Sequence, residues 1–125
     1  MDPPRPVRTD PRAERGRRGE DATLRAYVDR GFRPVARNWR CRLGEMDLVL
    51  ERGELLVFCE VKTRGGDAFG GGFEAVTDAK RRRLRALAEV FLATCRPGHR
   101  RLRFDVASVR ERGGTFDVQI FEDAF

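Results

Sequence analysis

Charged side chains interrupt two apolar stretches in the middle of this chain. Glu45 and Asp47 lie within Gly-Glu-Met-Asp-Leu-Val-Leu. Glu60 and Lys62 lie within Leu-Leu-Val-Phe-Cys-Glu-Val-Lys-Thr-Arg. Burying a charged group is costly unless it is paired or bound to a metal ion. Carboxylates and an ammonium group inside apolar stretches therefore indicate a functional site.

The residue types at this site match the chemistry of a hard divalent cation. Mg²⁺ prefers oxygen ligands, usually one or two carboxylates together with water and phosphate. Asp47 and Glu60 can supply the carboxylates, and the carbonyl oxygen of Val61 a third ligand. Such an ion activates water and offsets charge on a leaving oxygen. Lys62 could orient the water or stabilise the transition state of phosphodiester cleavage.

Two strands joined by a tight turn must position these residues. The segment Glu51–Glu54 separates the two apolar runs, which predicts a β-hairpin over Glu45–Thr63. Alternate residues of a strand share a face, so Glu60 and Lys62 point to one side and Val61 to the other. We expect three carboxylates and one ammonium to meet at the end of the hairpin away from its turn.

A helix beginning at Glu20 adds a further acid. Leu24, Tyr27 and Val28 follow at the spacing of one helix face, and Gly31 fits the C-terminal end. Glu20 begins this apolar face, which favours a functional role. The alternative is that an acid in the first turn only complements the helix dipole.

The segment before this helix predicts little structure. Residues 1–14 are basic and rich in proline, which indicates a disordered leader. The segment Arg15–Gly19 is expected to be a loop or a frayed helix start. Residues 15–125 then form a single domain.

A second helix is expected over Asp78–Thr94, and it is strongly basic at its start. Positive charge at a helix N-terminus opposes the dipole but suits bound phosphates. Arg64, which continues the face of Glu60 and Lys62, can hold a phosphate through two hydrogen bonds. The alternative for the helix is a solvated charged face. The candidate nucleic-acid-binding residues are Arg64, Lys80, Arg81, Arg82 and Arg85. The buried stripe of the helix is Leu84, Leu87, Ala88, Phe91 and Leu92.

Three further strands complete the predicted order. They cover Phe32–Cys41, Leu102–Val109 and Thr115–Phe121, and the last two form a hairpin across Gly113-Gly114. The order is α-β-β-β-α-β-β, which predicts an α/β fold with a central mixed sheet flanked by helices. The glycine-rich segment Gly65–Gly72 could cradle phosphate, although a mobile flap or a plain linker fits its spacing better.

Composition restricts the class of protein. The chain has 125 residues and a net charge of +6, which favours a polyanionic partner such as nucleic acid. The three cysteines are widely spaced and predict reduced core residues of a cytoplasmic protein. Neither a membrane span nor a signal peptide is predicted. His99, the single histidine, is expected in a surface loop.

Several of these stretches together resemble a known family. Asp47 followed by Glu60-x-Lys62 resembles the PD-(D/E)XK nuclease signature, and an upstream helical Glu20 is typical of its Holliday-junction-resolvase-like branch. The ordered set over about residues 15–125 is similar to the YraN-like family of uncharacterised bacterial proteins. Its motifs here are Arg18–Glu20, Ala36–Arg40, Gly44–Leu48, Phe58–Arg64, Arg103–Val106 and Ala124-Phe125.

The resemblance implies a restriction-endonuclease-like core and a site placed residue by residue. Glu20, Asp47, Glu60 and Lys62 would be catalytic, and Mg²⁺ or Mn²⁺ would be held by Asp47, Glu60, Val61 and Glu20. Two other acids remain open: Asp105 is a partner of a core arginine or lines the site. Glu45 is a supporting acid or only a strand-start residue.

The implied function is a metal-dependent endonuclease acting on branched or otherwise structured DNA. The intact set of acids and lysine favours this over a catalytically silent nucleic-acid-binding module. A third alternative is an adaptor of a DNA repair or uptake machine. Resolvases of this type act as dimers because they cut two strands symmetrically, so a homodimer is also an expectation.

Overall fold

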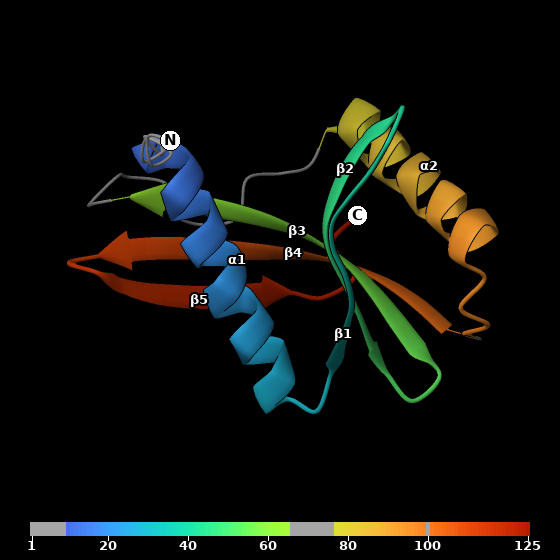
Figure 1. The fold of residues 1–125 in the computed structure, drawn as a ribbon, viewed down its shortest axis with the longest axis horizontal. Helices are drawn as coiled ribbons and strands as arrows, with labels where there is room; N and C mark the ends of the chain where they lie inside the picture. The colour runs from blue at the N-terminus through green and yellow to red at the C-terminus, as the bar shows by residue number, and fades with distance from the viewer. Residues whose placement is uncertain (1–9, 66–76, 100) are drawn as a thin grey trace, which may run out of the picture.

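The computed structural model describes residues 10–65, 77–99 and 101–125. Two helices and five strands follow one another in the predicted order α-β-β-β-α-β-β (Figure 1). They are α1 (Pro11–Asp29), β1 (Arg33–Cys41), β2 (Gly44–Arg52), β3 (Leu55–Gly65), α2 (Asp78–Cys95), β4 (Arg101–Arg112) and β5 (Thr115–Phe121).

The five strands form one mixed sheet in the order β1-β2-β3-β4-β5. Pairing is antiparallel except between β3 and β4, which run parallel. A parallel pair needs a long crossover connection, and α2 lies in that connection between β3 and β4. The prediction of an α/β fold with a mixed sheet is therefore confirmed.

The two helices cover opposite faces of the sheet. Leu56 and Phe58 of β3 pack in one core cluster with Phe91 of α2. Val57 and Cys59, at the alternate positions of β3, pack in a second cluster that contains α1 residues. Because alternate strand residues face opposite sides, the sheet is the middle layer of three. Figure 1 shows α1 lying across β3, β4 and β5, with α2 beside β2.

Helix α1 begins earlier than the sequence predicted. It starts at Pro11, because the Asp10 side chain accepts a hydrogen bond from the Arg12 N–H and proline fits the first helical turn. The prediction that residues up to 14 form a disordered leader is therefore wrong for residues 11–14. Residues 1–9 of that leader lie outside the described residues. Gly31 follows the helix with a φ of 88°, as predicted for its C-terminal end.

The buried face of α1 is rotated relative to the prediction. Its fully buried residues are Gly19, Thr23 and Tyr27, whereas Val28 is 49% exposed. Small residues at positions 19 and 23 bring the helix backbone close to the sheet. The apolar pattern that included Val28 did not predict this close approach, because such a pattern considers only large apolar side chains.

The second helix and the hairpins lie close to their predicted places. Thr77 caps α2, and the buried residues of α2 are Leu84, Leu87, Ala88 and Phe91. The turn between β2 and β3 is shorter than predicted, since β2 extends to Arg52. Of the predicted glycine-rich loop, Gly65 ends β3 and residues 66–72 lie outside the described residues.

Two composition-based predictions have different outcomes. Cys41, Cys59 and Cys95 are all free, as predicted, but only Cys59 is a core residue, since Cys41 is partly buried and Cys95 is exposed. His99 is not the surface histidine that was expected: its side chain is 8% exposed, and Nε2 lies 2.7 Å from Glu51 Oε2. The loop before β4 packs against the end of β2, a long-range contact that the sequence does not reveal. In the described ranges, neither helix is long and apolar enough to cross a membrane.

Candidate functional site

The site lies where β2 and β3 separate. Their antiparallel pairing begins at the turn and ends at the pair Leu48 and Cys59. Beyond that pair, the Asp47 side chain replaces a backbone partner, because Asp47 Oδ2 accepts a hydrogen bond of 2.8 Å from the Val61 N–H. This bond fixes the Asp47 carboxylate against the strand segment that carries Glu60.

Burial and neighbouring acids raise the pKa of Asp47 to about 7. Burial is the largest cause, and the Val61 hydrogen bond acts in the opposite direction. The negative charges of Glu60, Glu20 and Glu45 raise the pKa further. The predicted acids are therefore close enough to affect one another. A cation at this place would favour the charged form of Asp47.

Glu20 reaches the site because α1 approaches the sheet at a glycine. A Cβ on Gly19 would overlap the Thr63 hydroxyl, so the helix backbone lies directly against β3. The next residue, Glu20, is then mostly buried, with a side chain that is 14% exposed. The close approach of α1 thus places a helix-borne acid beside a strand-borne acid.

The carboxylate of Glu20 is only partly satisfied. Its Oε1 lies 3.5 Å from Arg37 Nε, yet it is buried and makes no hydrogen bond. Burial raises the pKa of Glu20, and the Asn38 amide and Arg37 guanidinium oppose that rise. A buried oxygen without a donor suits a cation or an ordered water.

Asn38 is a residue of this site that the sequence prediction missed. It falls between the β1–β2 pairs Arg37↔Leu48 and Trp39↔Met46, and so lies opposite Asp47. Its φ of 52° is unusual for a strand residue, and asparagine tolerates this conformation better than most. An asparagine within a strand pattern was the available signal, since asparagine is depleted in strands.

Glu60 and Lys62 lie on the α2 side of β3, as the predicted alternation requires. The Glu60 side chain is 18% exposed, and its Oε1 lies 3.5 Å from Lys80 Nζ at the start of α2. Lys62 is partly buried two residues further along β3. Lys80, which the sequence placed among the nucleic-acid-binding residues, therefore contacts a predicted catalytic acid.

The remaining basic residues divide into two groups. Arg64, Arg81 and Arg82 are exposed. Arg85 is also exposed, but its guanidinium carbon lies 4.7 Å from the centre of the Phe104 ring and its Nη2 donates to the Phe125 carbonyl. These contacts give Arg85 a role in packing that the helix pattern did not reveal.

The acids do not form a complete protein cage for a metal ion. Across residues 10–65, 77–99 and 101–125, no three histidine, cysteine, aspartate or glutamate side chains are grouped closely enough to hold one. Mg²⁺ sites, however, commonly use one or two carboxylates and complete their shell with water and phosphate. The partly buried pair Asp47 and Glu60 fits that kind of site.

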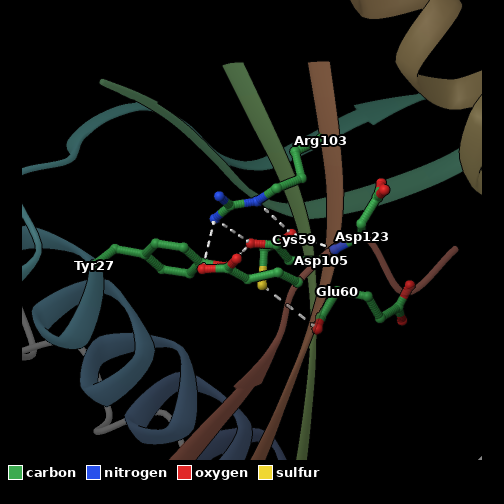
Figure 2. A network of polar contacts seen from close by, with 7 residues as sticks. Tyr27, Cys59, Glu60, Arg103, Asp105 and Asp123 are labelled. Carbon is green, nitrogen blue, oxygen red and sulfur yellow. Dashed lines mark hydrogen bonds and ion pairs between the residues drawn. The ribbon is translucent and has the colours of Figure 1, made fainter. Parts of the chain in front are cut away.

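Asp105 belongs to a separate buried network (Figure 2). It accepts hydrogen bonds from Tyr27 Oη at 2.7 Å, from the Asp123 N–H at 3.0 Å and from two nitrogens of Arg103. Of the two roles left open for Asp105, the core arginine partner is the one observed. Figure 2 shows the Glu60 side chain pointing away from this network.

Tyr27 and Cys59 of the same network are held in their neutral forms. Burial is the largest cause of a raised pKa in both residues. A buried thiol with a raised pKa is a poor nucleophile. Cys59 is therefore a core residue whose thiol is poorly suited to act as a nucleophile.

Comparison with known proteins agrees with this arrangement of motifs. The model of the uncharacterised protein family UPF0102 matches residues 19–109. The chain belongs to UPF0102. The resemblance to the YraN-like family is thus confirmed at the family level, and the matched range contains Glu20, Asp47, Glu60 and Lys62.

Relatives in UPF0102 come from diverse bacteria. A UPF0102 protein of Mycolicibacterium vanbaalenii is 50% identical over 103 residues, covering 82% of this chain and 84% of the relative. One from Parafrankia sp. is 48% identical over 111 residues, covering 88% and 94%. One from Dictyoglomus thermophilum is 38% identical over 114 residues, covering 90% and 97%.

Proposed function

We propose that this UPF0102 protein is a divalent-metal-dependent nuclease of the PD-(D/E)XK type that cuts branched or otherwise structured DNA. The observation that carries the proposal is the environment of Asp47. Its carboxylate is fixed by the Val61 N–H at 2.8 Å, and the charges of Glu60 and Glu20 raise its pKa. Several acids around a buried carboxylate are unfavourable without a cation.

Asp47 and Glu60 would hold Mg²⁺ or Mn²⁺, with the Val61 carbonyl as a further ligand and Glu20 beside them. The ion would lower the pKa of water and neutralise charge on the phosphate being cut. The buried Oε1 of Glu20 supports this assignment, because it makes no hydrogen bond even though Arg37 Nε lies 3.5 Å away.

Lys62 would act on the substrate and its attacking water. It lies on the same face as Glu60, and lysine is a compact donor of one positive charge. In this position it would orient the water and stabilise the charge that develops on the phosphate. Glu20 would keep Asp47 and the water in place. The net charge of +6 supports an anionic substrate.

A binding module without catalysis is the second candidate, and one contact favours it. Lys80 Nζ lies 3.5 Å from Glu60 Oε1, so a lysine occupies part of the space that a cation would need. In a nuclease, this ammonium would move toward the DNA phosphates when the metal binds. In a binding module, the pair would persist in every state.

The direct test is incubation of the protein with labelled linear, nicked, flapped and four-way DNA, in Mg²⁺, in Mn²⁺ and in EDTA. A nuclease gives products with metal and none in EDTA, and the proposal expects the branched forms to be cut best. DNA binding without cleavage in every metal would favour the second candidate. The homodimer stays a prediction that sedimentation of the protein–DNA complex would test.

Melting temperatures test metal binding separately from DNA cleavage. A ligand that binds only the folded state stabilises the protein more as the ligand concentration rises. We expect added Mn²⁺ to raise the melting temperature of the wild type and of Asp117→Asn, an exposed acid on β5. Asp47→Asn should show little or no rise. Equal rises in all three proteins would remove Asp47 from the ligand set.

A further inference from the structure

A basic hollow lies beside the candidate site, between the first turns of α1 and the end of β3. It has a volume of about 330 Å³. Its lining residues are Arg12, Arg15, Thr63, Arg64 and Gly65. Three of these five residues are arginines, and none of the five is acidic.

The packing of α1 on β3 explains why the arginines meet there. The helix runs antiparallel to the strand, with Gly19 against Thr63 and Arg15 against Gly65. Four helix residues advance about 6 Å and two strand residues about 6.6 Å, so the two elements stay in step. A Cβ on Gly65 would come 2.6 Å from Arg15 Cζ. A glycine at this position therefore lets the arginine lie flat on the strand.

The same geometry brings a second arginine of α1 to the hollow. Arg12 precedes Arg15 by three residues, and residues at this spacing are neighbours on a helix surface. Arg64 comes from the strand, immediately before Gly65. The hollow is therefore built by two elements that pack directly together.

The charge of the hollow selects an anion. Arg15 Nε pairs with Glu111 Oε2 at 2.7 Å, which offsets part of the positive charge that the three arginines bring to the hollow. Like charges held together are unfavourable until a counter-charge binds. Guanidinium groups bind phosphate oxygens through paired hydrogen bonds.

We propose that this hollow binds a backbone phosphate of the nucleic acid whose neighbouring segment passes Glu60 and Lys62. Arg64 lies four residues beyond Glu60 on β3, roughly 13 Å along a strand. Glu60 and Lys62 face the α2 side of β3 and the hollow lies on its α1 side, so the nucleic-acid strand would pass around the end of β3 at Arg64, which lines the hollow and shares the face of Glu60. The inference rests on the proposed function for the identity of the ligand, but the hollow needs neither metal nor cleavage to bind it.

The test measures binding of a short fluorescent single-stranded DNA in EDTA as salt is increased. Arg12→Gln with Arg64→Gln should weaken binding about tenfold or more at low salt and reduce the salt slope by about 0.7, the value for one lost phosphate contact on a single strand. The matched control is Arg33→Gln with Arg101→Gln, which removes the same charge at the opposite end of the sheet. Unchanged binding in the first variant, or an equal loss in the control, would overturn the proposal.

Two further measurements separate the proposed contact from unfolding and from binding of free phosphate. Melting temperatures show whether the double variant is folded, and the exposed Arg12→Gln alone replaces it if it is not. Inorganic phosphate is then added as a competitor. Displacement of the DNA at a phosphate concentration near the Kd of the DNA would make the hollow a free-phosphate site and overturn the assignment to a backbone. Because EDTA prevents cleavage, a wild type that never cuts DNA would defeat the proposed nuclease and leave this test unaffected.

Discussion

At the scale of single residues, the Asp47 carboxylate is subject to opposing effects. The Val61 N–H favours its charged form, whereas burial and the charges of Glu60, Glu20 and Glu45 favour its neutral form. The effects that favour the neutral form are larger, so the pKa of Asp47 lies near 7. Below about pH 7, Asp47 therefore holds a proton that a bound cation would displace.

This environment predicts how stability depends on pH in EDTA. The folded state holds a proton on Asp47 up to about pH 7, whereas the unfolded state loses it near pH 3.8. Over this window the folded state binds more protons, so stability falls as pH rises. One pKa unit corresponds to about 1.4 kcal/mol, which makes the total penalty up to about 4 kcal/mol above pH 7.

Asp47→Asn removes this titration and keeps an acceptor for the Val61 N–H. We expect its free energy of unfolding to exceed that of the wild type by an amount that grows from pH 4 to pH 8, as measured by urea unfolding. Asp117→Asn on β5 is the control and should show no such growth. A difference between Asp47→Asn and wild type that stays constant with pH would mean that Asp47 titrates normally.

At the scale of elements, the close approach of α1 to β3 connects the fold to the site. Gly19 lets the helix touch Thr63, and this contact places Glu20 beside Asp47 and Arg15 beside the end of β3. A displacement of α1 would therefore disturb both the acids and the basic hollow.

Gly19→Ala tests this contact. The added methyl group would overlap the Thr63 hydroxyl, and overpacking of this kind costs about 1–3 kcal/mol. We expect a loss of stability of that size, together with weaker Mn²⁺ stabilisation. Gly16→Ala is the matched control in the same helix, because a Cβ there meets nothing within 4 Å. It should stabilise the protein by about 0.5–1 kcal/mol, and an equal loss in both variants would contradict the account.

Helix α2 is the second element with a testable role. Its start lies at the site, because Lys80 contacts Glu60, and Arg81 and Arg82 are exposed beside it. Replacing both with alanine should weaken duplex DNA binding and flatten the salt slope by about two, one per lost phosphate contact. The Arg33 and Arg101 double variant again controls for net charge. An unchanged slope would make this run a solvated face.

At the scale of the whole molecule, periodic patterns in the sequence predicted most of the fold. Alternation in β3 placed Glu60 and Lys62 on one face and Val61 on the other, and the turn at Gly53 predicted the hairpin. The buried stripe of α2 was predicted correctly except at Leu92, which is only partly buried, because large apolar side chains repeat along it. Periodicity reports which side of an element is buried, and that was enough to bring Asp47 and Glu60 into one region.

Other features depend on contacts between distant segments, which periodicity does not encode. The early start of α1 depends on a single cap at Asp10. The left-handed Asn38 and the pairing of Lys80 with Glu60 require the packed sheet and helix to be known. Arg85 shared its pattern with Arg81 and Arg82, yet it contacts Phe104 of β4 and the C-terminal Phe125, which are distant in the sequence.

The role proposed for Lys62 is to stabilise the transition state of DNA cleavage. The decisive measurement compares the single-turnover cleavage rate and the DNA affinity of wild type, Lys62→Ala and Lys62→Arg, on whichever of the linear, nicked, flapped and four-way DNAs is cut best. We predict a loss of rate of about 10²-fold or more in Lys62→Ala, with nearly unchanged affinity. Lys62→Arg should also be impaired, because guanidinium lacks the compact geometry of ammonium. Wild-type cleavage rates in Lys62→Ala, or a wild type that binds DNA and cuts none under any metal, would contradict the account.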